Sequence, residues 1–401
     1  MAATPFHSGT GSASVKYDGA KNFRLRLILS TLTGKRVTFR NIRTSGSRTG
    51  LTASEGNFVR LLDKLTNGTV IEINDTGTIL KYKPGILIGS RGRLRHECNG
   101  NRGLGYWIEG VLMLAPFMKW PLDLQLVGAT EGHYELSVDT VSNVSAPLLR
   151  RLTSNDIPVE MKVERRAARG SKGGSVVLKC GILRNKIKPV DLIDEGVIKR
   201  LRGIAYGNGV SPAFVNRIVD RTRGIFNSFL PDVYVYTDHR NEATCGNGYG
   251  LSLVAESTTG CLLGADWATS EKGVEPEAVA DAAANQLIQE VDYSGCVDSS
   301  NACLALLYCA LADEDVSRIR IGTLSEAATE FLRDLRTFLG VTFTIKVAEP
   351  RTSSQNEDPS DSDGDSASDE ESSSNVQSAQ SRGILLSCVG RGYGNIARTR
   401  F

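Results

Sequence analysis

The sequence of 401 residues lacks several features that would assign it to a class of protein at once. No apolar run reaches the roughly 18 residues that a membrane-spanning helix needs. The N-terminal stretch MAATPFHSGTGSAS has no apolar signal-peptide core. The eight cysteines form no C-x-x-C pair, and His96 beside Cys98 does not by itself make a zinc site. We therefore expect an intracellular protein with reduced cysteines, no membrane contact and no metal.

Charge is unevenly distributed along the chain, although the net charge is only +2. Residues 349–381 hold nine acids and one base, many serines and almost no large apolar side chains. Such a segment cannot offset its ordering entropy by burial, so we predict a disordered acidic insertion at 349–382. The remaining chain has 46 bases and 36 acids. This excess favours a polyanionic partner, although solvated surface charge explains it equally well.

The stretch 295–312, GCVDSSNACLALLYCALA, combines a polar start with a fully apolar continuation. Its polar residues are all good helix N-cap residues: Asp298, Ser299, Ser300 and Asn301. Residues 302–312 are apolar on every side, which predicts a buried helix. Free backbone N–H groups and the helix dipole at such a start favour an anion. A plain N-cap on a core helix explains the same residues.

Apolar periodicity elsewhere predicts alternating helices and strands. A leucine-rich stripe predicts a helix that ends at Gly34, and 53–65 predicts a second helix. The predicted strands of this region are 36–43, 69–73, 79–82 and 86–88. Two helices on one face of a mixed sheet form a sensible α/β layer. Residues 91–102 and 165–176 are predicted as basic loops that suit RNA phosphates, or as ordinary exposed loops.

The stretch 295–312 resembles the matching segment of the RNA 3'-terminal phosphate cyclase family. In active members that segment reads Gly-x-Val-Asp-x-His-x-Ala-Asp-Gln before a Leu-rich helix. The matching positions here are Gly295, Val297, Asp298 and Ala302. Further similar segments are Gly19, Arg24, Thr33-Gly34-Lys35, Asn41-Ile42-Arg43, Gly105-Tyr106-Trp107-Ile108-Glu109 and a degraded glycine signature at 165–176. The resemblance covers most of 18–348 and 383–398.

The resemblance places Ser300 at the position of the family's nucleophilic histidine, the residue that ATP adenylates. The family's Asp and Gln fall on Cys303 and Leu304. Imidazole is a nucleophile near neutral pH, whereas an unassisted hydroxyl is not. The DSSN version is similar to the cyclase-like branch, which is known for ribosome assembly and not for cyclisation. The resemblance therefore implies no catalytic residue, no metal and no cofactor.

The same resemblance implies the fold and its division. We expect an α/β protein of α+β layers, in which repeated units of two helices on a four-stranded sheet form a large domain with a smaller inserted α/β domain. The expected parts are a flexible N-terminus (1–17), the large domain (18–184 and 271–348), the inserted domain (185–270), the acidic insertion (349–382) and a final strand with the C-terminal tail (383–401).

Six basic residues are candidates for holding an anion or an RNA phosphate. They are Lys21, Arg24, Arg43, Arg166, Arg169 and Lys172. The first three lie in or near the segments that match the family's N-terminal motifs, and the other three lie in the degraded glycine signature. Basic side chains beside backbone N–H groups of a flexible loop suit phosphate, but a basic β-hairpin without a binding role explains the last three residues equally well.

The function that the resemblance implies is that of a scaffold. The chain would act in the nucleus and nucleolus, in the small-subunit processome beside an assembly GTPase, in pre-rRNA processing toward small-subunit rRNA. Contact with pre-rRNA or a small nucleolar RNP would fit the basic body. A pre-rRNA endonuclease is the alternative, although the sequence shows no clear carboxylate cluster for two metals. Surviving cyclase activity would require another histidine, namely His96, His133 or His239, at the vacant position.

Overall fold

The computed structural model describes residues 14–45, 48–99, 101–131, 135–171, 173–347, 383–395 and 397. Three predictions fall outside these residues: the first part of the flexible N-terminus, the acidic insertion at 349–382 and the phosphate candidate Lys172.

The first unit is a four-stranded sheet with two helices. Its elements are β1 (Val15–Asp18), α1 (Phe23–Thr33), β2 (Val37–Arg40), α2 (Ala53–Leu65), β4 (Val70–Ile73) and β5 (Leu80–Lys83). The strand order is β1-β2-β5-β4, with β1 parallel to β2. Both predicted helices are confirmed: α1 ends at Gly34 in the left-handed conformation, and α2 begins with a capping box between Thr52 and Glu55.

Three details of this region differ from the predictions. Residues 15–17 belong to a paired strand and not to a flexible terminus. The predicted strand at 86–88 does not continue the first sheet; instead β6 (Ile86–Leu87) pairs with β3 (Thr66–Asn67) in a separate two-stranded sheet. Residues 91–102 are not one loop, because β7 (Leu94–Glu97) forms within them. These strands are only two to four residues long, too short for a reliable alternation pattern.

The second unit repeats the pattern of the first. Its elements are β7, α3 (Gly105–Leu114), η1 (Ala115–Phe117), β8 (Leu122–Val127), α4 (Val138–Thr140), η2 (Val141–Ser145), α5 (Ala146–Leu152), β9 (Val159–Arg165) and β10 (Ser175–Cys180). The strand order is β7-β8-β10-β9, with β7 parallel to β8. The helical stretch from α4 to α5 is not uniform, because its middle part, η2, has π-helical hydrogen bonding.

The third unit is interrupted in sequence. Its elements are β11 (Asp191–Leu192), α8 (Ala302–Leu311), β16 (Val316–Ile321), α9 (Glu326–Leu339), β17 (Thr344–Val347) and β18 (Ile384–Val389). The strand order is β11-β16-β18-β17. The final strand predicted after the acidic insertion is therefore confirmed, and it occupies an interior position of this sheet.

The inserted unit lies between β11 and α8 in sequence. Its elements are β12 (Ile198–Asn208), α6 (Pro212–Phe226), β13 (Val233–Arg240), η3 (Ala243–Cys245), β14 (Gly248–Ser257), β15 (Leu262–Thr269) and α7 (Pro276–Asp292). The strand order is β13-β12-β14-β15, and a separate apolar core joins this sheet to α6 and α7. The expected boundary at 270 falls between β15 and α7, which pack against each other, and β11 pairs outside this unit.

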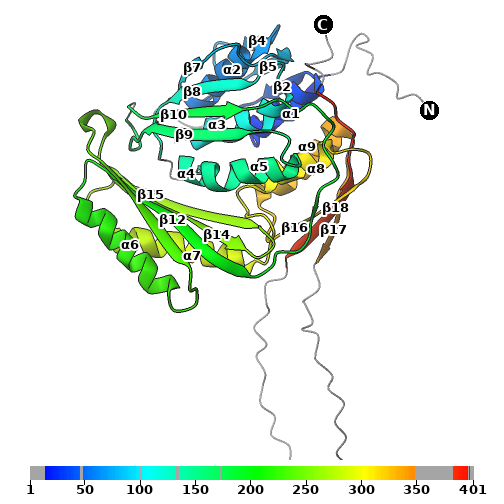
Figure 1. Cartoon of the computed structure of the whole chain (residues 1–401). Helices are drawn as coiled ribbons and strands as arrows, with labels where there is room; N and C mark the ends of the chain where they lie inside the picture. The colour runs from blue at the N-terminus through cyan, green and yellow to red at the C-terminus, as the bar shows by residue number, and fades with distance from the viewer. Residues whose placement is uncertain are drawn as a thin grey trace, which may run out of the picture.

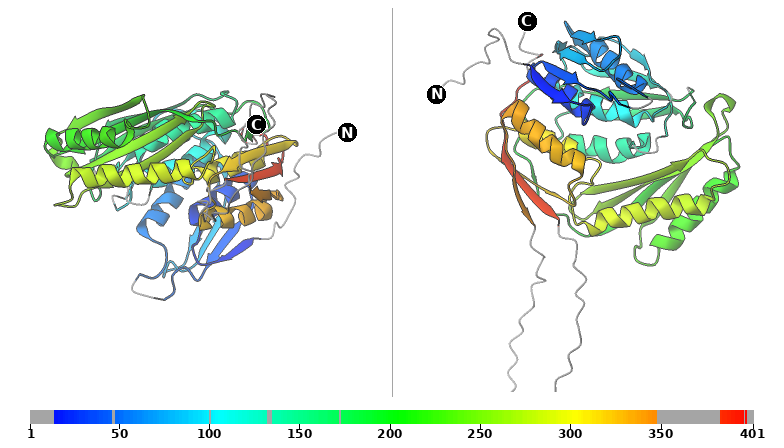
Figure 2. Two further views of the ribbon diagram at one scale, coloured as in Figure 1. Left: turned by 90° about the horizontal axis from the view of Figure 1, so that it is seen from below. Right: turned by 180° about the vertical axis from the view of Figure 1, so that it is seen from behind.

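The predicted fold class, with its repeated two-helix units and a smaller insertion, is confirmed. One apolar cluster contains buried residues from the first, second and third units. Figure 1 shows the sheet of the second unit above α4 and α5, and the sheet of the inserted unit below them. Figure 2 shows α7 and α6 together on the outer face of that lower sheet. No helix within the described ranges is long and apolar enough to cross a bilayer.

Helix α8 lies in the middle of the shared core. The side chains of Ala305, Leu306 and Leu307 have no exposed surface, and the Tyr308 hydroxyl donates to the Met113 carbonyl oxygen at 3.5 Å. The stretch from which a buried helix was predicted therefore forms one over Ala302–Leu311.

Replacement of Leu306 by Ala should leave a cavity in this core and lower the free energy of unfolding by about 2–5 kcal/mol. The matched control is Ile345→Ala on β17, where the side chain is 52% exposed and the change should stay within about 0.5 kcal/mol. Urea unfolding followed by circular dichroism measures both. Equal stability of the two variants would contradict the central place of α8.

Candidate functional site

A cavity of about 250 Å³ opens at the N-terminus of α8. Its wall contains Arg24, Leu25 and Ile28 from α1, Glu109, Gly110, Leu112 and Met113 from α3, Ser145 from η2, and Ser299, Ser300, Asn301, Cys303 and Leu304 around the start of α8. Helices from all three repeated units thus contribute to it. The hydroxyl of Ser145 is buried and makes no hydrogen bond.

The polar residues before α8 are largely used by the protein itself. One carboxylate oxygen of Asp298 accepts hydrogen bonds from the backbone N–H (2.8 Å) and the side-chain amide (2.9 Å) of Asn301, and the other accepts from the Gly264 N–H at 3.1 Å. Burial raises the pKa of Asp298 to about 6, against these hydrogen bonds. Ser299 donates both its N–H and its hydroxyl to Glu290 of α7. Asp298 and Ser299 therefore tie the helix start to the inserted unit.

Close packing fixes the path of the chain into this helix start. A Cβ atom on Gly295 would lie 2.3 Å from the backbone nitrogen of Gly322, so only glycine fits there. A Cβ atom on Gly264 would meet Thr140 and Val144 at 2.9 Å, and it would lie 3.6 Å from Asp298. The glycine before the helix is thus a requirement of packing.

Ser300 also lines the cavity, but it differs from its neighbours. Its side chain is exposed and makes no hydrogen bond to the described residues. Cys303, one helical turn further on, lines the same cavity, but burial raises its pKa to about 12. Its thiol is therefore a poor nucleophile near neutral pH. No histidine stands among the described residues that line this cavity.

Two of the scattered histidines are described, and both are engaged elsewhere. Nε2 of His96 on β7 lies 2.8 Å from Oδ1 of Asn57 on α2. Burial and the nearby Lys64 and Arg60 lower its pKa to about 4. Nε2 of His239 on β13 lies 2.7 Å from the Val210 carbonyl oxygen. His133 lies outside the described residues.

Arg24 is the phosphate candidate that lies in the cavity with Ser300. Its guanidinium group donates to the Tyr106 carbonyl oxygen, stacks 4.1 Å from the centre of the Tyr106 ring and forms a 3.1 Å ion pair with Glu109. Glu109 belongs to the segment 105–109 that resembles the family, but no role was expected for its side chain. An anion in the cavity would have to compete with this carboxylate for Arg24.

Lys21 and Arg43 are also paired with carboxylates. The Lys21 ammonium group lies 2.6 Å from Glu326 of α9, so it joins the first unit to the third. Arg43 donates to Glu55, the capping residue of α2, and to the Gly50 carbonyl oxygen at 2.9 Å. Neither side chain lines the cavity at α8. These two candidates therefore support local structure and are not part of one anion site.

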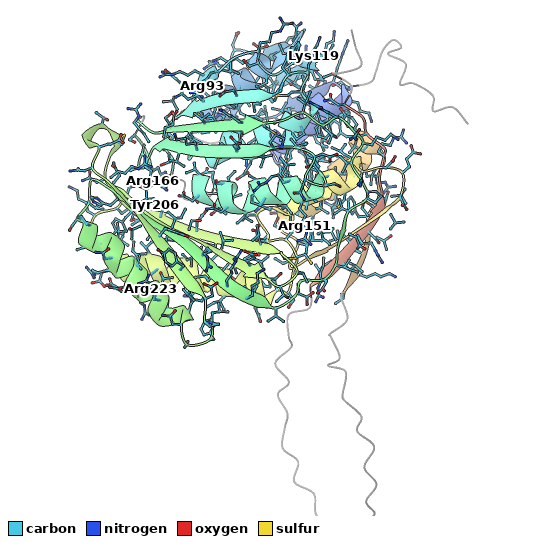
Figure 3. The ribbon with its side chains drawn as sticks, in the orientation of Figure 1. Arg93, Lys119, Arg151, Arg166, Tyr206 and Arg223 are labelled. Carbon is cyan, nitrogen blue, oxygen red and sulfur yellow. The ribbon has the colours of Figure 1, made fainter. Side chains whose placement is uncertain are left out.

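Arg166 is buried between the second and the inserted units. Its two terminal nitrogens donate to both oxygens of Asp139 at 2.7 and 2.9 Å, and its Nε donates to Asp238 on β13 at 2.6 Å. Its guanidinium carbon lies 4.5 Å from the centre of the Tyr206 ring, and Figure 3 shows the two side chains together between the sheets. The sequence signal missed both acids, because neither lies near Arg166 in the chain.

The remaining basic candidates lie at the surface. Arg169 is exposed in the loop between β9 and β10 and borders a second cavity with Glu131 and Trp267. In the other predicted basic loop, the ion pairs are Arg93–Asp123, Arg95–Glu97 and Arg102–Glu135, at 2.9–3.3 Å. Arg91 lies over the Trp120 ring. Most of these cations therefore already have an acidic or aromatic neighbour.

Comparison with known proteins gives a consistent result. The family model for RNA 3'-terminal phosphate cyclase matches residues 15–345. A human protein named "RNA 3'-terminal phosphate cyclase-like protein" is 41% identical over 396 residues, which cover 97% of this chain and 99% of the human one. A Dictyostelium discoideum protein with the same name, preceded by "Probable", is 40% identical over 403 residues, covering 96% and 100%. The "rRNA processing protein rcl1" of Schizosaccharomyces pombe is 34% identical over 387 residues, covering 96% and 97%.

Replacement of Arg166 by Met should destabilise the protein by about 3–5 kcal/mol, because it leaves the buried Asp139 without its partner. The matched control is Arg169→Gln in the same loop, which should change the free energy of unfolding by less than about 0.5 kcal/mol. Urea unfolding at neutral pH measures the difference. A loss below about 1 kcal/mol for the first variant would mean that Arg166 does not hold the units together.

The buried carboxyl group of Glu131, near Arg166, should make the free energy of unfolding depend on pH. Burial raises its pKa to about 8, and its Oε1 atom makes no hydrogen bond. The folded protein therefore retains a proton that the unfolded chain releases near pH 4.5, so this contribution to stability is lost as the pH rises from about 4.5 to about 8. Glu131→Gln should remove the loss. The free energies of unfolding of both proteins should diverge over this range, and parallel pH profiles would contradict the assignment.

Proposed function

This chain belongs to the RNA 3'-terminal phosphate cyclase family, and on that premise we propose that it acts in rRNA processing without cyclase chemistry. The observation that carries the second half of the proposal is Ser300, exposed at the mouth of the cavity before α8. The printed name of the Schizosaccharomyces pombe relative supports the first half. The cyclase-like names of the human and Dictyostelium relatives support a divergent member of the family.

The chemistry of the cavity supports the loss of nucleotidyl transfer. A hydroxyl attacks phosphorus only when a neighbouring base takes its proton. The acid nearest in sequence, Asp298, accepts hydrogen bonds from Asn301 and Gly264 and is 1% exposed. Cys303 holds its proton far above neutral pH. Neither group is therefore available to take the proton of Ser300, and Glu109, the carboxylate in the described cavity wall, is paired with Arg24.

The size and charge of the cavity support the absence of a nucleotide cofactor. Small-molecule and cofactor sites usually enclose about 300–1,000 Å³, whereas this cavity has about 250 Å³. Its one lining cation among the described residues, Arg24, is already paired with Glu109. A triphosphate would meet a carboxylate at the place where its charge needs neutralisation. We therefore assign the cavity no cofactor.

The wider role that we propose is that of a scaffold in the small-subunit processome. In this role the chain would contact an assembly GTPase and processome proteins, in the nucleus and nucleolus, in a step toward small-subunit rRNA. Direct contact with pre-rRNA or a small nucleolar RNP belongs to the same proposal. The excess of bases over acids outside 349–381 supports a polyanionic partner. The resemblance of its DSSN stretch to the cyclase-like branch supports the rest.

Incubation of the pure protein with ATP labelled on the α-phosphate should give no covalent adenylate. Ser300→His tests whether the imidazole alone is missing; we expect no adenylate on this variant either, because Arg24 remains paired with Glu109. Labelling of Ser300→His but not of the parent would show that only the nucleophile has been lost. Labelling of the parent chain would overturn the proposal.

Replacement of the native gene by a Ser300→Ala allele tests the processing role without catalysis. We expect pre-rRNA intermediates, measured by Northern blot, to remain at parental levels, whereas depletion of the protein should make them accumulate. The endonuclease alternative is tested on pure protein with a pre-rRNA fragment, with and without Mg²⁺. Site-specific cleavage would replace the scaffold role by an enzymatic one.

A further inference from the structure

Two cysteines from distant parts of the chain lie side by side where the inserted unit meets the third unit. Cys261 directly precedes β15, and Cys296 lies in the segment that leads to α8. Leu262 and Val297 form a parallel β-bridge. Cys261 directly precedes Leu262, and Cys296 directly precedes Val297. Neighbouring strands lie about 4.8 Å apart, and a disulfide spans Cα separations of about 4.4–6.8 Å. The two backbones are thus placed for a disulfide.

The surroundings of Cys261 favour its thiolate. Nη1 of Arg151 lies 3.7 Å from the sulfur, and the Thr259 hydroxyl lies 3.5 Å from it. In its protonated form the Cys261 thiol donates to the Asp194 carbonyl oxygen at 3.5 Å. A hydrogen bond with the Cys296 thiol lowers the pKa of Cys261 well below the usual range, and Thr259 and Arg151 contribute in the same direction against burial. The thiolate is the reactive form of cysteine.

Cys296 has the complementary character. A hydrogen bond to Cys261, burial and the charge of Cys261 raise its pKa. Once Cys261 is oxidised, the raising effect of its charge is gone, so the pKa of Cys296 falls and its sulfur lies beside the product as the resolving thiol. The backbone N–H of Cys296 donates to the Arg320 carbonyl oxygen at 2.9 Å, which fixes the segment on the side of β16.

Four other buried thiols lack such surroundings. Burial raises the pKa of Cys98, Cys180, Cys309 and Cys388. Cys309 on α8 and Cys388 on β18 belong to the same apolar cluster, and no arginine contributes to the pKa of either thiol. They serve as an internal control pair.

One exposed side chain contacts the Cys261 sulfur. Cys261 and Cys296 are 2% and 3% exposed, whereas Arg151 is exposed at the end of α5, lies 3.7 Å from the sulfur and donates to the Gly260 carbonyl oxygen at 3.0 Å. Figure 3 shows Arg151 in the space below α5, toward the lower sheet.

We propose that Cys261 and Cys296 form a redox-active dithiol, which hydrogen peroxide converts to a disulfide between the inserted unit and the third unit. The Cys261 thiolate attacks one peroxide oxygen; an S–O bond forms, the O–O bond breaks, and the departing hydroxide takes up a proton to give water. The Cys296 sulfur then attacks the sulfenic sulfur; the S–S bond forms, the S–O bond breaks, and the thiol proton leaves with the hydroxide as a second water. Two thiols are oxidised by two electrons, and one peroxide is reduced.

The disulfide would act on a junction that the fold already uses. Val297 bridges Leu262 of β15 on one side and Ile321 of β16 on the other, so this segment joins the two sheets through hydrogen bonds. Four residues after Cys296 the chain reaches Ser300 at the cavity. Oxidation therefore adds a reversible covalent link between the inserted unit and the start of α8.

Treatment of the native full-length protein with hydrogen peroxide, followed by alkylation of the remaining thiols, digestion and mass spectrometry, tests the proposal. We expect a linked peptide pair joining Cys261 to Cys296, its return to free thiols on reduction, and a higher Tm of the oxidised protein. Arg151→Gln keeps both thiols and should shift the pH profile of the oxidation rate to higher pH, because Arg151 lowers the pKa of the Cys261 thiol.

Variants separate the two steps. Cys296→Ser should stop the reaction at a Cys261 sulfenic acid, which dimedone traps, whereas Cys261→Ser should leave Cys296 reduced. Cys388→Ser, in the control pair, should leave the rate unchanged. A native protein that gives no linked pair, a linked Cys309–Cys388 pair in its place, or a Cys296→Ser variant without a dimedone adduct would each overturn the proposal. Because the first measurement uses no substitution, a misfolded variant does not decide the outcome.

Discussion

The burial of α8, in which nine of the ten residues are buried, is the constraint on which the rest of this structure depends. A ten-residue helix that is apolar on every side must be covered on every side. The first, second and third units supply that cover, and their buried side chains form one continuous apolar cluster with it. The inserted unit has its own core and is fastened to the helix start through Asp298 and Ser299. The cavity that α8 lines lies at the polar end of this helix, where the units meet.

Regular elements were readable from the sequence where periodicity was long and termini were marked. The helices that begin after Thr52 and Ser211 have a side-chain cap, and α8 begins where the polar residues end. Short strands were less readable, since β1, β6 and β7 offer two to four residues of alternation. The place of α7 was missed as well, because its alanine-rich face does not say which sheet it covers.

The sequence indicated where the candidate site lies, but not which side chains form it. Ser300 and Arg24 line the same cavity although they are 276 positions apart in the sequence. The resemblance to a family is what suggested that both belong to one site. The fate of the basic residues was not readable. Asp139 and Asp238 approach Arg166 from other elements, and Glu326 approaches Lys21 from α9. Spacing along the chain carries no information about such partners. The sequence therefore could not show that the ion pairs of Lys21 and Arg166 join different units.

The order of strands in the third sheet has a consequence for synthesis on the ribosome. Its first strand, β11, leaves the exit tunnel about 110 residues before α8, and its interior strand β18 emerges last of the four strands. Domains generally fold as they emerge, from the N-terminus onward, so the inserted unit has time to acquire its own core while β11 waits for β16. Closure of the third sheet then awaits the emergence of β18. Until then a nascent chain of this protein carries an unfinished sheet edge, and exposed edges of this kind are sites at which chaperones and aggregation compete.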